Sequence, residues 1–257
     1  MKSFLMIGIL VSSFAGVLAA EDTSHARYVI WKFDDLRTGP KGNRVPGCTR
    51  LVDWATAQHM PISLGIIANS LPTATAEDKA WLLQHAAEKG GVVEFWNHGW
   101  DHHKTAVEGQ RPTFEFQGPD EQHQGATLIQ AQAAMVAATG LTFRSFGAPF
   151  NATDEATIGA LDRVPELTVW MYGMVKDQSR TILRPSIPLE IKTGVISEEA
   201  FLKAYTNPQA PYLLLQGHPP YWDEASFAAF THIAARLTKD GWTSITPQGY
   251  AAVLHRH

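Results

Sequence analysis

The sequence predicts an α/β protein whose parallel strands form a barrel of about seven β/α units in one domain. Short apolar runs typical of buried strands alternate with longer amphipathic segments from residue 28 to residue 254. The 257 residues, of which 45% are hydrophobic and 18% charged, are sufficient for one domain with a large core. Because helices connect most of the strands, the strands are expected to run parallel.

The predicted strands and helices follow one another along most of the chain. The strands are short apolar runs at positions 28–33, 62–67, 92–96, 143–146, 167–170, 212–215 and 243–245. The helices are segments of helical periodicity at positions 45–58, 76–89, 122–139, 155–161, 198–205, 224–238 and 248–254. Gly90 and Gly91 provide a stop signal after the second helix. The two longest remaining stretches, 103–119 and 171–188, are predicted to be loops.

The N-terminal segment has the pattern of a secretory signal peptide. Lys2 gives it a positive start, residues 4–11 are apolar, and small residues end it at Ala20 before an acidic pair. A membrane anchor is the alternative, but an anchor needs about 20 mostly apolar residues, and serines and a glycine interrupt this segment. We therefore expect residues 1–20 to be removed and residues 21–257 to form a secreted or periplasmic domain that does not insert stably into a membrane.

Charge and cysteine content exclude several classes of protein. The chain has 21 Lys and Arg against 25 Asp and Glu, a formal net charge of −4, and no block of basic residues. Nucleic acid is therefore not an expected partner. The single cysteine, Cys48, excludes an internal disulfide framework and an all-thiolate metal site. The sequence leaves the oligomeric state open.

Several predicted strands are followed at once by ionisable residues. In a parallel α/β barrel the functional side chains lie at the carboxyl ends of the strands. Asp34 and Asp35 end the first strand, His98 and His102 follow the third, and His218 follows the strand at 212–215. The sequence therefore places two carboxylates and several imidazoles on one rim of the barrel.

The two aspartates and two of the histidines have the composition of a metal site. Adjacent carboxylates repel each other unless a cation lies close by. His98 and His102 are four residues apart, a spacing that puts both imidazoles on one side of a helical turn, and one carboxylate would complete a set used for Zn²⁺ and other divalent ions. Alternatively, the aspartates could cap a helix and the histidines could decorate the surface. If the segment is not helical, His103 could replace His102.

Two segments resemble motifs of a known family. Phe33-Asp34-Asp35 and the run from Asn97 to His102 are similar to the first two motifs of the polysaccharide deacetylases, the NodB homology domains of carbohydrate esterase family 4. The resemblance, which extends from Phe33 to His218, implies a distorted (β/α)7 barrel that uses one divalent metal to hydrolyse N-acetyl or O-acetyl groups on sugars. It implies Asp34 as catalytic base. Asp35, His98 and His102 would hold the metal, with Zn²⁺ expected first and Co²⁺, Mn²⁺ or Ni²⁺ as alternatives.

The later motifs diverge from the family pattern. Arg144 is similar to the arginine that orients the base aspartate, but three or four extra residues separate it from the Pro-aromatic pair that ends in Phe150. By the same resemblance, the backbone N–H of Phe150 would stabilise the oxyanion and His218 would be the general acid. His218 stands in an unusual Gln-Gly-His-Pro context, and no segment matches the fourth motif.

The substrate is expected to be a carbohydrate. Trp100 and Trp222 lie near the predicted rim and could stack on sugar rings, with core packing as the alternative for each. The leading hypothesis is a secreted metal-dependent deacetylase of an amino-sugar polymer or oligosaccharide. The alternatives are an O-acetyl esterase, a hydrolase of a small non-sugar amide, an enzyme such as a lyase on the same site, and a catalytically degenerate carbohydrate-binding protein.

Overall fold

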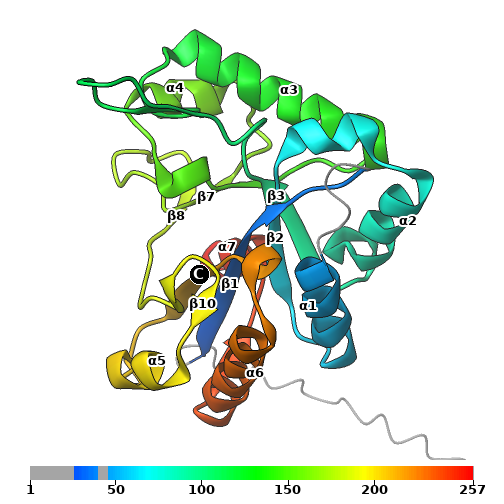
Figure 1. Cartoon of the computed structure of the whole chain (residues 1–257), viewed down its shortest axis with the longest axis vertical. Coiled ribbons are helices and arrows are strands. Elements are labelled where there is room, and N and C mark those ends of the chain that lie inside the picture. The colour runs from blue at the N-terminus through cyan, green and yellow to red at the C-terminus, as the bar shows by residue number, and fades with distance from the viewer. Residues whose placement is uncertain (1–25, 40–45, 257) are drawn as a thin grey trace, which may run out of the picture.

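The computed structural model describes residues 26–39 and 46–256 and shows a strongly curved parallel sheet surrounded by helices (Figure 1). The predicted signal peptide at residues 1–20 lies outside the described residues. The described part of the predicted mature domain forms one barrel, so the strand ends singled out above belong to a single sheet.

The sheet has eight parallel strands. Its order is β11-β1-β2-β3-β6-β7-β8, and β12 also pairs with β1. The strands are β1 (Arg27–Leu36), β2 (Ile62–Ile66), β3 (Val93–Asn97), β6 (Ser145–Phe146), β7 (Val169–Met171), β8 (Thr181–Leu183), β11 (Tyr212–Gly217) and β12 (Trp242–Ser244). The segment after β8 reaches β11 through hydrogen bonds between Ser186 and Leu214, from Ser186 N to Leu214 O (3.2 Å) and from Leu214 N to Ser186 Oγ (3.0 Å). The ring is therefore nearly closed, which confirms the predicted distorted (β/α)7 barrel.

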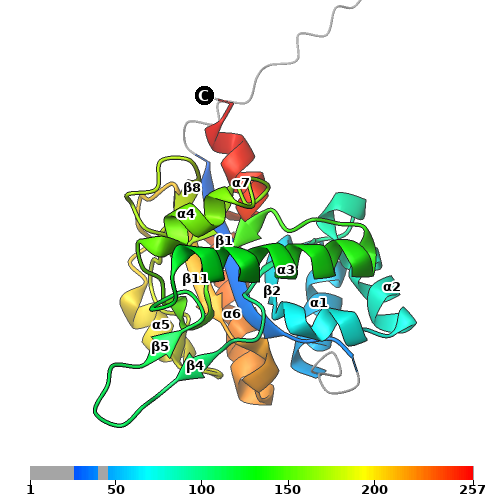
Figure 2. The same ribbon diagram turned by 90° about the horizontal axis from the view of Figure 1, so that it is seen from above.

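Helices follow most of the strands and cover the outside of the barrel (Figures 1 and 2). They are α1 (Pro46–Ala57), α2 (Ala76–His85), α3 (Glu121–Thr139), α4 (Ala156–Asp162), α5 (Glu198–Ala204), α6 (Glu224–Lys239) and α7 (Pro247–Leu254). Each predicted helix is present. The second ends earlier than predicted, at His85, and is followed by a 3-10 turn over Ala87–Lys89. Polar side chains begin several helices; Asp120, for example, accepts a hydrogen bond from His123 N at the start of α3.

The two predicted loops contain strands. The stretch 171–188 contains β8, and 103–119 contains the antiparallel pair β4 (Lys104–Thr105) and β5 (Thr113–Phe114). A second such pair, β9 (Glu190–Lys192) and β10 (Val195–Ile196), precedes α5. These strands have two or three residues each, which is too short for a period of two to stand out in the sequence. The β4–β5 hairpin projects from the body of the molecule (Figure 2).

The alternation of side chains along β1 defines two apolar layers. Trp31 and Phe33 face outward and pack against Phe230 of α6, with ring centroids 5.2 and 5.5 Å from that ring. Ile30 faces the barrel interior, as does Lys32 two residues later. The interior cluster of buried apolar residues comprises Ile30, Trp96, Val169, Met171, Leu183, Leu214, Tyr250 and Ala251. Because the last two belong to α7, that helix closes the amino end of the barrel and leaves the carboxyl end open.

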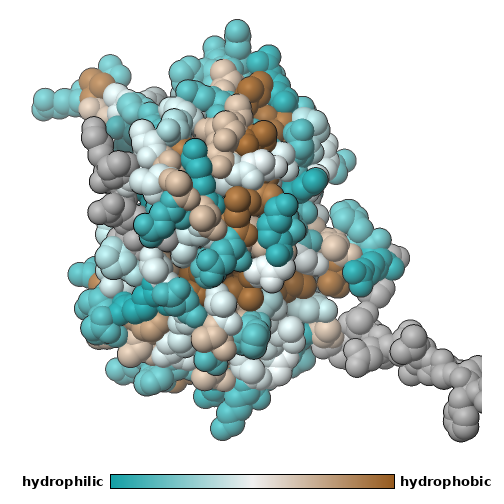
Figure 3. Space-filling model, turned by 90° about the vertical axis from the view of Figure 1, so that its right-hand side faces the viewer, coloured by the Kyte–Doolittle hydropathy of each residue, from teal (hydrophilic) through white to brown (hydrophobic). Residues whose placement is uncertain are grey.

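The surface viewed in Figure 3 mixes hydrophilic side chains with several small hydrophobic groups. Among the described residues, no helix is both long enough and apolar enough to span a membrane.

Candidate active site

A break in the regularity of β1 brings two adjacent aspartates to the open rim. In a regular strand Asp34 and Asp35 would point to opposite faces of the sheet. The pairing of β1 with β2 shifts register between Phe33 and Leu36, and Asp35 has a positive φ of 72°. This bulge turns Asp35 while Asp34 keeps the inward direction of Lys32. Both carboxylates therefore reach the same end of the barrel.

His98 and His102 meet through a loop. The expectation of a helical turn is wrong, because residues 98–103 follow β3 as irregular backbone with positive φ at Gly99 (76°) and His102 (63°). The carboxylate of Glu115 accepts hydrogen bonds from the backbone N–H groups of Trp100 and His102 (2.9 Å to the latter). These N–H groups are thereby committed to a side chain, so the loop does not continue as a helix.

Glycine is required within this loop. A Cβ on Gly99 would lie 2.6 Å from Glu115 Oε2, and the Gly99 N–H is held by Asn97 Oδ1 at 2.9 Å. The neighbouring His103 is exposed and its Nε2 contacts Thr105 Oγ1 at 2.6 Å. His102 is therefore the residue directed to the rim, and His103 points elsewhere, as expected if His102 binds the metal.

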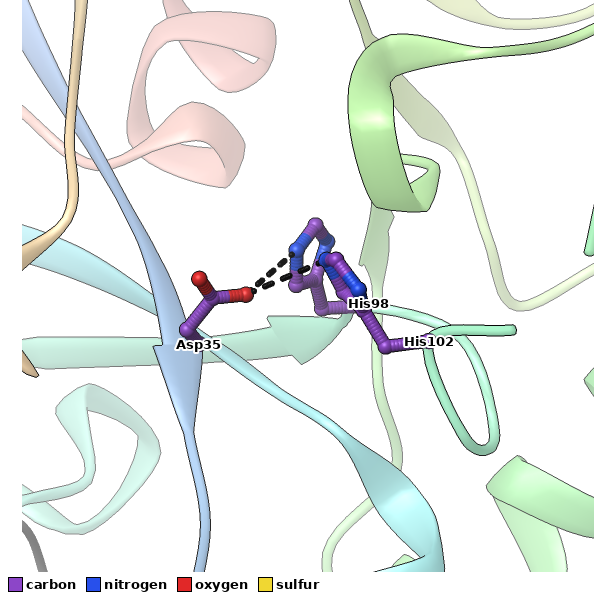
Figure 4. Close-up of side chains that lie close together, drawn as sticks. All are labelled: Asp35, His98 and His102. Atoms are coloured by element: carbon purple, nitrogen blue, oxygen red, sulfur yellow. Dashed lines mark ion pairs between the residues drawn. The ribbon is translucent and has the colours of Figure 1, made fainter. Parts of the chain in front are cut away.

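Asp35, His98 and His102 lie close enough together to hold one metal ion (Figure 4). Asp35 Oδ1 lies 3.2 Å from His98 Nε2 and 3.3 Å from His102 Nε2. Two ligand atoms on a tetrahedral zinc ion, each about 2.0–2.2 Å from the metal, are separated by about 3.3–3.6 Å. The two distances from Asp35 Oδ1 are therefore close to those of a zinc site, and all three ligand atoms lie within 4.8 Å of one another.

The surroundings of these atoms also fit a cation. Asp35 Oδ1 is buried and has no hydrogen-bond partner among the described residues, a costly arrangement unless a cation satisfies it. His98 Nδ1 lies 2.7 Å from Gly147 O, so that nitrogen can donate its proton to the carbonyl and leave the Nε2 lone pair directed at Asp35. Burial raises the pKa of Asp35, but hydrogen bonding to His98 and the charges of His98, His102 and His218 in their protonated forms outweigh this and lower it to about 2. Asp35 is therefore ionised and able to ligate.

Asp34 is held by different partners. Lys32 Nζ lies 2.7 Å from both carboxylate oxygens of Asp34, and Gln216 Nε2 donates to Asp34 Oδ2 at 2.7 Å. The Lys32 side chain is fully buried in the barrel and lies over the rings of Trp96 and Tyr172, 4.9 and 5.2 Å from their centroids. Burial lowers the pKa of Lys32, and the carboxylate of Asp34 opposes this effect.

Arg144 does not make the contact predicted for it. It precedes β6, and its exposed side chain lies at the amino end of the sheet, away from the carboxyl rim. Its carbonyl accepts hydrogen bonds from Thr168 N and Gln248 Nε2, both at 2.9 Å. The cation beside Asp34 is Lys32, which belongs to the same strand as the carboxylate.

His218 also lies close to the carboxylate of Asp34. Its Nε2 is 3.9 Å from Asp34 Oδ2, and its Nδ1 is 2.7 Å from Glu190 Oε2. Burial lowers the pKa of His218, but the hydrogen bond with Glu190 and the charges of Asp34, Glu190 and Asp35 raise it overall. The Glu190 carboxylate also accepts from His218 N (2.7 Å) and Trp222 Nε1 (2.6 Å). Glu190 therefore favours the protonated imidazole and fixes its orientation.

Trp222 is not the exposed platform predicted from the sequence. It is 6% exposed and packs against Phe33 and Phe230, with ring centroids 5.4 and 5.1 Å away. Its indole N–H donates to Glu190, and it is Tyr221 that projects into solvent, with 60% of its surface exposed. Trp100 is partly buried against the core.

A cavity of about 470 Å³ opens over these groups. It is lined by Asp34, Asp35, His102, Phe150, Asn151, Thr193, Gln216, His218 and Tyr221. The ring of Phe150 packs against that of His102, with centroids 4.2 Å apart and an interplanar angle of 54°, and its backbone has a positive φ of 58°. Trp100 is not among the lining residues. A larger cavity of about 620 Å³, at the amino ends of β2 and β12, contains His59 and Lys239 as its ionisable residues and offers no comparable acid–base arrangement.

Sequence reasoning missed Lys32, Gln216 and Glu190 as parts of this site. A signal existed for Lys32, because a lysine two residues before Asp34 in an apolar strand must face the interior and share the side of that carboxylate. Gln216 stands between the strand predicted at 212–215 and His218, which also places it at the rim. Glu190 begins β9 of the short β9–β10 hairpin, whose position the sequence pattern did not reveal.

No protein-family model and no curated protein matches the chain. Solved structures do. A family 4 acetyl xylan esterase from Clostridium thermocellum, in complex with a cobalt ion, has 15% sequence identity and a TM-score of 0.58, covering 86% of this chain and 88% of that one. The peptidoglycan deacetylase PdaC from Bacillus subtilis has 12% identity and a TM-score of 0.57, covering 90% and 93%.

A family 4 pseudoenzyme from Bacillus anthracis is also similar, with 10% identity, a TM-score of 0.58 and coverage of 85% of this chain and 63% of that one. At these identities the similarity is one of fold. The chain therefore has the fold of the family 4 carbohydrate esterases, the polysaccharide deacetylase fold that its first two motifs predicted.

Proposed function

We propose that this protein is a metal-dependent hydrolase that removes acetyl groups from a carbohydrate. The observation that carries the proposal is the grouping of Asp35, His98 and His102 beside a separately held carboxylate, Asp34, and a histidine acid, His218, in one open cavity. The similarity of fold to esterases and deacetylases of family 4 supports it. The fold alone would not, because barrels host many reactions.

The residues present fit one divalent metal, with Zn²⁺ expected first. Asp35, His98 and His102 would hold it, in the two-histidine, one-carboxylate set common in catalytic sites. When bound, such an ion polarises the acyl oxygen and makes a water molecule acidic enough to attack at neutral pH. Co²⁺, Mn²⁺ and Ni²⁺ are alternatives for the same ligands.

Two residues of the chain would move the protons. Asp34 accepts a proton from the attacking water, which its position inside the cavity allows. His218, kept protonated by Glu190, donates a proton to the departing group. The backbone N–H of Phe150 is proposed as a donor to the oxyanion, and the ring of Phe150 closes that side of the cavity over His102.

N-acetyl groups on an amino sugar are the proposed substrate. An amide nitrogen leaves as an amine only after it is protonated, so a histidine whose pKa is raised suits amide hydrolysis. The open cavity and the exposed ring of Tyr221 suit a sugar chain that lies across the rim. An O-acetyl ester is the second candidate, because a neighbour in fold is an acetyl xylan esterase.

Elemental analysis combined with an acetate-release panel tests the proposal. The purified protein should contain about one divalent metal per chain and release acetate from chitin oligomers, and the chelated protein should regain activity when Zn²⁺ or Co²⁺ is added. Release from acetylated xylan alone would assign it as an esterase. Full metal occupancy with no acetate released from either substrate would contradict the proposal and favour a sugar-binding protein.

We also propose that residues 1–20 are a signal peptide and that residues 21–257 form the exported domain, on the sequence pattern alone. N-terminal sequencing of exported protein should begin at Glu21. Mature protein that retains Met1 would contradict this.

A further inference from the structure

We propose that Lys32 and Gln216 determine which of the two adjacent aspartates binds the metal, by holding Asp34 away from it. This inference rests on the proposed function for its chemical meaning. It concerns positioning residues, since Lys32 and Gln216 would act through Asp34.

The two carboxylates are close enough to compete for one ion. Asp35 Oδ1 lies 3.2 Å from His98 Nε2, and Asp34 Oδ2 lies only slightly farther from the same nitrogen, at 3.8 Å. A rotation of the Asp34 side chain would therefore bring a second carboxylate to the metal position. An aspartate that ligates the ion could no longer serve as the free base, because its lone pairs would be committed to the ion.

The hydrogen bonds of the two aspartates differ sharply. The Asp34 carboxylate accepts hydrogen bonds from Lys32 Nζ on both oxygens and from Gln216 Nε2 on Oδ2, each at 2.7 Å. Asp35 Oδ1 receives none from the described residues. Moving Asp34 to the metal would break bonds to a buried ammonium that has no other carboxylate within ion-pair distance in the described chain. Asp35 has no such bond to lose at Oδ1.

The restraining groups are themselves fixed. The Lys32 side chain is fully buried between Trp96 and Tyr172, and a Cβ on Gly147 would lie 3.1 Å from Lys32 Cε. Asn151 Nδ2 donates to Gln216 Oε1 at 2.9 Å, which leaves the amide nitrogen of Gln216 to face Asp34. The ammonium and the amide therefore act as a preformed clamp on one carboxylate.

The experiment compares Co²⁺-loaded variants, because the visible absorption of Co²⁺ responds to the number and geometry of its ligands. Lys32→Met should change the spectrum, as Asp34 turns to the ion, and should lower kcat by about 10²- to 10⁴-fold with little change in KM. The double variant Lys32→Met/Asp34→Asn should regain the wild-type spectrum but not the activity. Lys203→Met, which removes a charge from the exposed face of α5, is the matched control and should behave as wild type.

The spectra decide the proposal without a substrate. It is overturned if Lys32→Met keeps the wild-type spectrum, whatever its kcat, or if the double variant fails to restore the spectrum. Should Lys32→Met not fold, Gln216→Ala, a change at a partly exposed residue, should shift the spectrum in the same direction; an unchanged spectrum there overturns the proposal. If the wild-type protein releases no acetate but the variants give these spectra, the proposed function is contradicted and the inference stands. If the wild-type protein binds no Co²⁺, both are contradicted.

Discussion

Replacement of Glu190 by glutamine should separate the orientation of His218 from its charge. Glu190 Oε1 accepts two short hydrogen bonds, from His218 N at 2.7 Å and Trp222 Nε1 at 2.6 Å, whereas the backbone N–H that reaches Oε2, from Gly194, lies at 3.1 Å, so the single oxygen of a glutamine is expected to stay at the Oε1 position. The new NH₂ group would then face His218 Nδ1, which lies 2.7 Å from Glu190 Oε2 in the native protein. Two donors would oppose each other whenever the imidazole is fully protonated.

The size of the effect follows from the bond that is lost. A hydrogen bond to a charged group contributes about 1.5–3 kcal/mol, and each 1.36 kcal/mol is a factor of ten, so kcat/KM for an N-acetyl substrate should fall by about 10- to 150-fold near neutral pH. Glu190 raises the pKa of His218, so its loss lowers that pKa. The general acid must carry its proton, and activity should therefore fail at a lower pH on the alkaline side.

The assay is kcat/KM against pH for Glu190→Gln, with metal content measured on the same samples. Glu190→Asp, which keeps the charge, is the control and should retain more of the alkaline activity. The reasoning is refuted if Glu190→Gln keeps both the alkaline limb and a kcat/KM within about twofold of the native value, since the loss predicted from the charged bond is at least about tenfold.

Three further predictions follow from the same geometry. Asp34→Asn should lower turnover by about 10²- to 10⁴-fold and leave metal content unchanged; full activity would remove Asp34 as the base. His98→Ala and His102→Ala should each lose bound metal as well as activity, measured by elemental analysis, and stoichiometric metal in both would count against the site. Burial raises the pKa of Glu94 from 4.5 to about 7, so folding favours its neutral form. Relative to Glu94→Gln, the native free energy of unfolding should therefore fall by about 3 kcal/mol as pH rises from below 4.5 through 7, in urea titrations at each pH; parallel pH profiles of the two proteins would refute this.

The sequence was sufficient for the helices, for seven of the eight strands of the large sheet and for the residues at the ends of those strands. Strand and helix periodicity is local, and a parallel barrel then fixes which ends share a rim, so Asp34, Asp35, His98, His102 and His218 could be placed together. The distances in the structure bear out that placement. The helical turn expected from His98 to His102 is absent, but the placement of both residues is still correct, because the loop held by the Glu115 carboxylate brings the same two imidazoles together.

The partners of these residues were harder to predict because they depend on contacts between segments. Glu190 and His218 are 28 residues apart, and Gln216 and Asp34 are 182 apart, so no local pattern links them. Arg144 was assigned from similarity of motif, yet its position before β6 commits it to the amino end of the sheet. The position of Arg144 relative to its strand therefore indicates its end of the sheet better than the similarity of motif does.

The different surroundings of the adjacent aspartates originate in the backbone of β1. Up to Asp34 the strand alternates regularly, and that alternation places Lys32 and Asp34 on the same interior face. A regular continuation would have turned Asp35 outward with Phe33, into the layer that packs on α6. The register shift and the positive φ at Asp35 end the alternation between the two carboxylates, so that one faces a buried ammonium and the other faces two imidazoles. A pair of identical side chains thus acquires two environments from one irregular residue, and the motif cannot be understood as two equivalent acids.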